Sequence, residues 1–517
     1  MMSKQSFPQQ TVTEASATPI LRPVEIIERY YLNEPFAQAL IIRERSGQAK
    51  YLVVEAPLTE EERVWLDEIK KLLVDELEVD FRRLGSTDKA EQYLRNLVQA
   101  TTKNYRIGLS EGSLERVMYY LVRDFIYFDR IDPLMRDPRI EDISCNGYDL
   151  PIYVWHREFE SIPTNVVFEK PETLDKLIVK LTYVTGRAIS IAQPVVDGSL
   201  PDQSRIQLTY EKEVTRRGSS FTIRKFRERP FTVTDLIKLN TFSSRLAAWF
   251  WHVIEKQASL IVVGGTASGK TTTLNSFSMF IKPTAKIVSI EDTPELQLPH
   301  ENWLPSVVRT SFGSGSKIAE VSLFDLLKNA MRQRPEYIIV GEVRGTEAYT
   351  LFQAIATGHG GMCSLHADSV EATIRRLEAE PMNIPRQLIT TMDVIAVQAR
   401  VLLKDRPVRR IVAISEIVGI DPVTKHILTN DVFKWDPRTD SYTYYGRSYL
   451  LERISKRHGI DYDKALEELD NKQKVIDWMV EKNIHEFEDV VEVIRSYYLD
   501  PLKLVEKIGA EANEAKR

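Results

Sequence analysis

Hydrophobic residues in the first quarter of the chain recur mainly at the spacing of an amphipathic helix. Over 60–74 the apolar positions lie three and four residues apart among charged ones, which is typical of a half-buried helix. A second pattern of this kind covers 114–128, and two prolines shortly afterwards interrupt it. The pattern therefore predicts a helical N-terminal region over 23–130, after a polar, flexible tail at 1–22.

Short strand-like runs replace the helical pattern in the next segment, 131–229. Runs bounded by turn residues indicate strands, and one helix-like stretch lies among them at 173–185. The expected strands cover 151–155, 206–210 and 220–224. This combination predicts a separate α+β domain over 131–229.

Buried strand-like runs alternate with helical stretches over 230–449, and such alternation predicts a wound α/β sheet. The expected strands cover 260–263, 287–290, 337–340 and 363–365, and two hairpin turns follow at 421–424 and 436–440. The last segment, 450–517, is highly charged with helical spacing, so we expect a helical C-terminal extension. The fold class is therefore expected to be multidomain α/β.

A phosphate-binding motif follows the first strand of the wound sheet. Its residues satisfy G-x-x-x-x-G-K-[ST] and continue into a helix: Gly264, Gly265, Thr266, Ala267, Ser268, Gly269, Lys270, Thr271 and Thr272. Backbone N–H groups of such a loop converge on phosphate oxygens. Lys270 would reach the β- and γ-phosphates, and the Thr271 hydroxyl would coordinate Mg²⁺. The sequence thus predicts a site for a nucleoside triphosphate, with ATP and Mg²⁺ as the expected ligands.

A single carboxylate, Glu342, ends another buried strand of the same segment. Ligand-facing residues sit at the carboxyl ends of strands in wound sheets, so Glu342 is expected to point toward the phosphates. It could belong to the Mg²⁺ shell or orient the attacking water. Gly341 stands where many P-loop enzymes carry an aspartate.

Two further segments carry clustered polar residues. Glu291, Asp292 and Glu295 surround a proline at the end of a strand, and three acids near a magnesium–phosphate site need cations to balance them. His359 and His366 bracket a glycine-rich turn and a strand. Taken singly, each histidine is more often a hydrogen-bonded structural residue than a catalytic one.

In this order, the segments resemble those of the secretion ATPases of the type II/type IV secretion superfamily. The corresponding motifs are the P-loop, an aspartate box at 291–295, a Walker-B strand at 337–342 and a histidine box at 359–366. Upstream, Leu200-Pro-Asp-Gln-Ser-Arg-Ile206 and Phe221-Thr-Ile-Arg-Lys-Phe226 resemble two more family segments. Gln203 replaces the usual glycine of the first, which puts only the local turn geometry in doubt. The resemblance covers about 130–420.

The resemblance implies a RecA-like P-loop domain, with nucleotide between N- and C-terminal halves of subunits that form a homohexamer. Under it, Glu295 orients or deprotonates water while Glu342 holds the Mg²⁺ shell, and the reverse assignment stays open. His366 would be a sensor of the γ-phosphate. The candidate arginine fingers, acting in cis or in trans, are Arg205, Arg224 and Arg227.

Composition narrows the placement within the superfamily. Only two cysteines occur, Cys145 and Cys363, so the tetracysteine zinc module of bacterial type II secretion ATPases is not expected. The missing zinc module and the amino-acid sequences of the P-loop and aspartate box together favour the archaeal branch. The sequence lacks a signal-peptide pattern and an apolar run long enough to span a bilayer. A cytoplasmic protein that meets the membrane through a partner is therefore expected.

The functional prediction is an ATP-driven motor that assembles type IV pilus-like filaments (pilus or archaellum) or drives type II-like secretion. It would dock on a polytopic inner-membrane platform protein. A DNA-uptake or conjugation ATPase is the alternative. The formal net charge of −5 makes nucleic acid an unlikely main partner. Which filament or secretion system is powered, and whether it is assembled or retracted, stays open.

Overall fold

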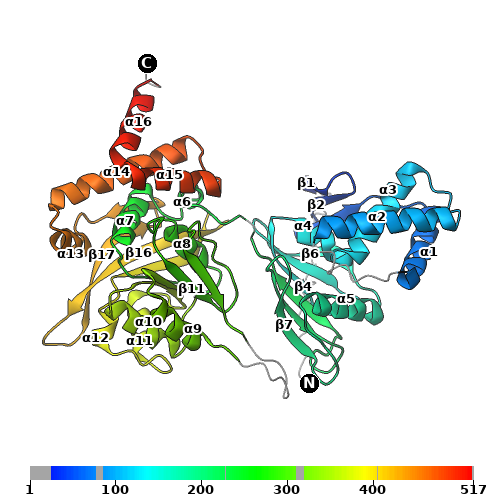
Figure 1. Ribbon diagram of the computed structural model, residues 1–517, viewed down its shortest axis with the longest axis horizontal. Coiled ribbons are helices and arrows are strands. Elements are labelled where there is room, and N and C mark those ends of the chain that lie inside the picture. Colours follow the sequence, from blue (N-terminus) through cyan, green and yellow to red (C-terminus); the bar gives the residue numbers. More distant parts are fainter. Residues whose placement is uncertain (1–24, 77–85, 228, 310–319, 405, 515–517) are drawn as a thin grey trace, which may run out of the picture. The chain divides into compact units, whose positions relative to one another are not determined.

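The chain divides into two compact units. The computed structural model describes residues 25–76, 86–227, 229–309, 320–404 and 406–514, so the expected tail at 1–22 lies outside the described residues. Unit 1 ends at Phe226 and unit 2 begins at Arg227 (Figure 1). The expected start of the P-loop domain, at residue 230, lies close to this division.

Unit 1 is built on a nine-stranded sheet with the order β1-β2-β3-β6-β5-β4-β9-β8-β7. Its strands are β1 (Glu25–Asn33), β2 (Ala37–Arg43), β3 (Ala49–Glu55), β4 (Ile140–Cys145), β5 (Pro151–His156), β6 (Glu160–Val167), β7 (Val195–Ser199), β8 (Arg205–Thr209) and β9 (Ser220–Arg224). Its helices are α1 (Glu60–Glu76), α2 (Thr87–Asn104), α3 (Glu111–Phe125), α4 (Asp132–Arg136) and α5 (Pro171–Val184), with the 3₁₀ turn η2 (Asp129–Ile131). Among the described residues, neighbouring strands of this sheet pair antiparallel except β3 with β6.

The prediction of a helical region over 23–130 is wrong for its first third. Residues 25–55 form the antiparallel strands β1 to β3, and helices begin only at Glu60. Ala37, Ala39 and Ile41 are buried at alternate positions of β2, the period of a half-buried strand. A strand gains most of its stability from pairing with distant residues, so the dominant helical spacing of the following segment masked this shorter signal.

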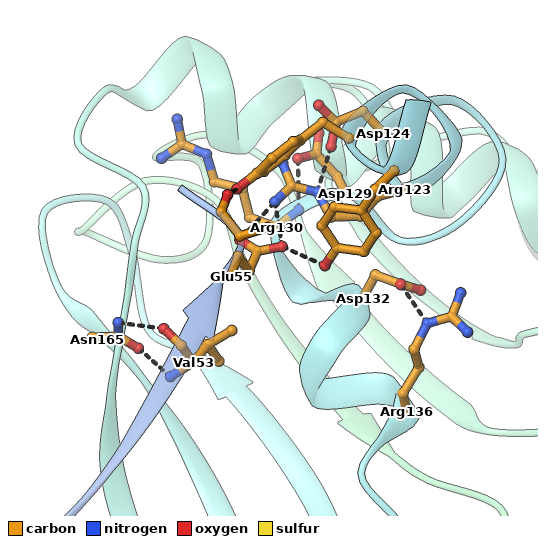
Figure 2. A network of polar contacts seen from close by, with 12 residues as sticks. Val53, Glu55, Arg123, Asp124, Asp129, Arg130, Asp132, Arg136 and Asn165 are labelled. Atoms are coloured by element: carbon orange, nitrogen blue, oxygen red, sulfur yellow. Dashed lines mark hydrogen bonds and ion pairs between the residues drawn. The ribbon is translucent and has the colours of Figure 1, made fainter. Parts of the chain in front are cut away.

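The N-terminal strands join the rest of the sheet through few but specific contacts. One bridge pairs Tyr51 of β3 with Thr164 of β6. Beyond it, the Asn165 side chain replaces a ladder peptide: the Val53 N–H donates to Oδ1 at 2.7 Å, and Nδ2 donates to the Val53 carbonyl at 2.9 Å (Figure 2). The carboxylate of Asp137, which is fully buried, accepts from the Tyr51 hydroxyl at 2.6 Å. The strands β1 to β3 therefore belong to the α+β sheet.

A network of charged side chains anchors α3 to this sheet. Arg123 donates to both carboxylate oxygens of Glu55 at 2.8 Å and to Asp124 at 2.7 Å (Figure 2). Lys70 of α1 reaches the same Asp124 at 2.5 Å. Because these groups are mostly withdrawn from water, each depends on its partner, and the network fixes α1 and α3 against β3.

Unit 2 holds a second nine-stranded sheet, with the order β12-β11-β13-β14-β10-β15-β16-β17-β18. Its strands are β10 (Leu260–Val263), β11 (Ile287–Glu291), β12 (Trp303–Val307), β13 (Tyr337–Val340), β14 (Gly360–Leu365), β15 (Val394–Leu403), β16 (Arg406–Ile420), β17 (Ile427–Asp436) and β18 (Ser441–Tyr444). Its helices are α6 (Val233–Lys238), α7 (Ser244–Glu255), α8 (Lys270–Ser278), α9 (Leu323–Ala330), α10 (Glu347–Ala356), α11 (Val370–Glu378), α12 (Arg386–Ile389), α13 (Tyr449–His458), α14 (Tyr462–Glu481), α15 (Phe487–Leu499) and α16 (Pro501–Glu514), with the 3₁₀ turn η3 (Met331–Gln333).

Six neighbouring strands of this sheet, β12-β11-β13-β14-β10-β15, run parallel, which confirms the wound α/β sheet. Successive residues of the central strand β10 enter different cores: Leu260 and Val262 pack in one, Ile261 and Val263 in the other. Helices α7, α8 and α14 lie on one face of the sheet, and α9 to α12 on the other (Figure 1). A strand covered on both faces is a continuous apolar run, which is why β10, β11 and β13 were readable from the sequence.

The expected helical extension at 450–517 forms α13 to α16 over its described residues, which end at 514, and it shares the main core of unit 2. Leu469, Ile476 and Met479 of α14 are fully buried in the cluster that holds Trp249 and Trp251 of α7. These helices therefore complete the cover of the P-loop sheet.

Candidate functional site

The P-loop connects β10 to α8 at the carboxyl edge of the parallel strands. Gly269 caps α8 with φ of 92°, a left-handed conformation that favours glycine. Gly264 is constrained differently: a Cβ there would lie 2.2 Å from the backbone oxygen of Gln398 and 2.5 Å from Oγ of Ser268. Both motif glycines are therefore required by the geometry of the loop.

The loop region fits a phosphate ligand. It leads into the N-terminus of α8, where backbone N–H groups and the helix dipole favour an anion. Within the described part of the chain, the buried Oγ of Ser268 has no hydrogen-bond partner. Buried polar atoms without partners are rare in folded proteins. Thr271 and Thr272, in the first turn of α8, are partly exposed.

Lys270, His366 and Glu342 form a chain of contacts beside the loop. Lys270 Nζ donates to the Gly265 carbonyl at 2.9 Å and lies 3.4 Å from Nδ1 of His366. Nε2 of His366 lies 3.0 Å from Oε1 of Glu342. Arg344 donates to the other carboxylate oxygen of Glu342 at 2.6 Å. The three predicted residues thus meet, although Lys270 begins α8 while Glu342 and His366 follow β13 and β14.

The electrostatics of this chain favour a neutral histidine and an ionised glutamate. Burial lowers the pKa of His366, and the Lys270 charge lowers it further. Burial also lowers the pKa of Lys270, which the charges of Glu342 and Glu295 oppose. Burial raises the pKa of Glu342, but the Arg344 hydrogen bond and charge outweigh it, so the net pKa falls below its usual value.

Glu291, the last residue of β11, organises the acidic segment that follows. Its side chain is buried, and Oε1 accepts from the backbone N–H groups of Glu295 at 3.0 Å and Leu296 at 3.1 Å. Burial raises the pKa of Glu291 to about 7. Glu295 itself is exposed. The carboxylate expected to act on water is thus presented by a turn that Glu291 holds.

Gly341 explains how this site dispenses with an aspartate before Glu342. A Cβ at Gly341 would lie 3.1 Å from Cγ of Glu291, which leaves little room for a longer side chain. The neighbouring strand therefore fills this space with its own carboxylate.

The donor set suits Mg²⁺. This ion prefers a few protein oxygens together with substrate phosphates and water, and the Thr271 hydroxyl and the Glu342 carboxylate are oxygens of that kind. When bound, the ion would neutralise charge on the phosphates.

The predicted arginines belong to different units of the chain. Arg227, at the start of unit 2, lies over the Phe231 ring at 3.3 Å, and Gln297 donates to its carbonyl at 2.6 Å. Arg205 and Arg224 are directly opposite each other on β8 and β9 of unit 1. They line an open groove of about 550 Å³, where Arg224 lies 3.3 Å from Asp142. Their role as arginine fingers stays a prediction.

The remaining features of the motifs have structural roles. His359 lies at the start of β14, at the strand end opposite to His366, and its Nδ1 lies 3.0 Å from the Ala354 carbonyl oxygen. Gln203 has φ of 68°, so it adopts the left-handed conformation of the glycine that it replaces. The family turn is therefore retained.

Sequence reasoning missed two residues next to the P-loop, Gln398 of β15 and Arg409 of β16. Gln398 contributes the backbone oxygen beside Gly264, and Arg409 Nε donates to the Ala267 carbonyl at 3.2 Å. Neither residue stands in a recognisable motif. The only available signal was the cluster of basic residues at 400–410.

The comparison with protein families decides the assignment. The sequence matches the family model described as Type II/IV secretion system protein over residues 140–486, more than half of the chain. The chain belongs to this family. Among curated relatives, MJ0900 of Methanocaldococcus jannaschii, itself uncharacterized, is 37% identical over 474 residues, which cover 87% of this chain and 85% of that protein.

A second uncharacterized protein of the same organism, MJ1287, is 47% identical over 264 residues, 51% of this chain and 97% of its own length. These archaeal relatives agree with the expected archaeal branch of the secretion family. Among solved structures, the VirB11 ATPase of the Brucella suis type IV secretion system, in complex with sulphate, is 25% identical, with 55% of this chain and 92% of that chain covered and a TM-score of 0.28. No helix among the described residues is both long and apolar enough to cross a membrane.

Proposed function

We propose that this protein is an ATP-hydrolysing motor. The observation that carries the proposal is the contact chain from Lys270 through His366 to Glu342 beside a well-formed P-loop. Phosphoryl transfer requires mainly positioning and charge stabilisation, and this chain joins a phosphate-binding cation to a carboxylate at the edge where phosphates would lie.

Each side chain has a role in that chemistry. Lys270 leaves the Gly265 carbonyl and places its charge on the β- and γ-phosphates. Glu342 and Thr271 would hold the Mg²⁺ shell. Glu295 accepts a hydrogen bond from the attacking water. The turn that carries Glu295 is held by its backbone hydrogen bonds to the Glu291 side chain. His366 senses whether the γ-phosphate is present. Its ring lies between Lys270 and Glu342, and the bound phosphate would separate these two groups.

We further propose which process the ATP hydrolysis drives. A ring of six copies, docked on a polytopic membrane platform protein, would power assembly of a pilus-like filament or type II-like secretion. Membership in the type II/IV secretion family supports this role. A DNA-uptake or conjugation ATPase is the second candidate from the same family, and the net charge of −5 gives it no support.

Steady-state phosphate release tests the ATPase. Lys270→Ala should abolish turnover, and Glu342→Gln should bind ATP yet hydrolyse it at least ~100-fold more slowly. Lys282→Ala, which removes an exposed lysine of unit 2, is the matched control and should keep wild-type turnover. Wild-type turnover in both site variants would refute the assignment.

Two further measurements distinguish the processes that the motor could drive. DNA that stimulates turnover with a steep salt dependence would favour the conjugation candidate. A knockout scored for swimming, surface fibres and secreted protein distinguishes the motor roles, since loss of swimming alone selects the archaellum.

A further inference from the structure

The hairpin of β15 and β16 continues past the parallel sheet and reaches the P-loop. The β10–β15 ladder ends with Val263 opposite Val397, whereas the β15–β16 ladder continues to Leu403 opposite Arg406. An irregularity in the pairing separates Val397 from Gln398. From this point the hairpin stands beside the loop that follows β10.

The base of this hairpin touches the P-loop at three positions. The Gln398 backbone oxygen lies against Gly264. A Cβ at Gly269 would lie 3.1 Å from Nε2 of Gln398 and 3.2 Å from Cδ of Arg409. Between these glycines, Arg409 Nε donates to the Ala267 carbonyl at 3.2 Å. The P-loop thus packs against the base of the β15–β16 hairpin.

Ala267 is where the loop most needs this support. Its φ is 58°, a left-handed conformation that costs a residue with a Cβ roughly 1 kcal/mol. Such a conformation persists only where the surroundings favour it. A hydrogen bond to its carbonyl favours one orientation of the peptide that links Ala267 to Ser268, and the N–H of that peptide belongs to the phosphate-binding loop.

We propose that Arg409 is a positioning residue of the P-loop: by holding the Ala267 carbonyl, it keeps the loop N–H groups directed at the triphosphate. The inference rests on the proposed function in that the loop binds ATP. Arg409 lies outside the P-loop and both acidic motifs, and it acts through the shape of the loop. Affinity for the phosphates should therefore depend on it more than the chemical step does.

The test is nucleotide affinity of the full chain, measured by calorimetry. Arg409→Met should weaken the binding of ATP, ADP and inorganic tripolyphosphate alike, by about three- to tenfold, the range that corresponds to the net contribution of a typical hydrogen bond. Arg406→Met removes an exposed arginine from the tip of the same hairpin and should leave all three affinities unchanged. In turnover assays, Arg409→Met should raise KM and change kcat less than twofold.

A second substitution separates positioning from direct contact with the nucleotide. Glycine adopts the left-handed conformation without the Cβ penalty, so in an Ala267→Gly background the loss caused by Arg409→Met should fall below twofold. Three results would overturn the proposal: an unchanged affinity in Arg409→Met, an undiminished loss in the Ala267→Gly background, or a loss for ATP without a loss for tripolyphosphate. If the wild-type chain binds no ATP, the proposed function fails instead.

Discussion

His366 lies between the P-loop lysine and the Walker-B glutamate, with Nε2 3.0 Å from Oε1 of Glu342 and Nδ1 3.4 Å from Nζ of Lys270. An ammonium group only donates hydrogen bonds, so Nδ1 accepts, and a neutral ring then carries its proton on Nε2. The arrangement selects a neutral ring with one tautomer.

Turnover should therefore fall in acid as His366 gains a second proton. Burial and the Lys270 charge place its pKa below the usual 6.5, and Arg344 and Arg376 add to this lowering while Glu342 opposes it. A pH profile of kcat should show an acid limb below 6.5, where the protonated ring repels Lys270.

The matched variants identify the group behind this limb. His366→Gln offers one acceptor and one donor without titrating, so it should keep part of the turnover and lose the limb. Glu291→Gln should keep the limb, although Glu291 titrates in a neighbouring range. A limb that survives in His366→Gln and disappears in Glu291→Gln would reverse the assignment.

Two adjacent glycines of the P-loop should respond differently to alanine. Gly264→Ala places a Cβ 2.2 Å from the Gln398 oxygen, and a clash with backbone should cost about 1–3 kcal/mol of stability or more. Gly265→Ala meets nothing within 4 Å. Thermal melting without nucleotide should show a lowered Tm for the first variant only. Equal melting temperatures would contradict the packing of the loop on the hairpin.

Glu291 should make the stability of unit 2 depend on pH. Its pKa in the folded chain is about 7, against an ordinary 4.5, so its contribution to stability is complete below pH 4.5 and is lost as the pH rises through 7. Glu291→Gln keeps an acceptor for the two backbone N–H groups without titrating. Relative to the wild type, this variant should gain roughly 2–3 kcal/mol between pH 5 and pH 8, measured by urea unfolding. Glu301→Gln, at an exposed position, should show no such gain.

Lys472 should be essential for the packing of the C-terminal helices. Its side chain is 1% exposed, and Nζ lies 2.8 Å from Oε2 of Glu255 on α7. Lys472→Ala leaves that buried carboxylate with Lys256 as its remaining partner, at 2.9 Å, and should cost about 2–3 kcal/mol in denaturant unfolding. Lys474→Ala, on the exposed side of the same helix, should cost less than about 0.5 kcal/mol. Equal costs would show that α14 does not depend on this ion pair.

Features written in contiguous residues were predictable from the sequence. The P-loop needs a strand, a glycine turn and a helix in immediate succession, so Gly264 to Thr272 could be read directly. Buried parallel strands such as β13 are short apolar runs, and the one or two residues after such a run lie at the ligand edge, which located Glu342 and His366. Strands β1 to β3 escaped because their pairing partners are remote and their alternation is short.

The side chains of the candidate site were thus predictable from the sequence, while the contacts that support them were not. Insertion of β10 between β14 and β15 brings Gln398 and Arg409 to a loop more than 120 residues earlier in the chain. Burial of Glu291 against Gly341 depends in the same way on the pairing of β11 with β13. Local spacing specifies which side chains stand at a strand end. Which strand ends become neighbours depends on the order and register of the strands. That order is set by the burial of both faces of the sheet, which only the tertiary structure decides.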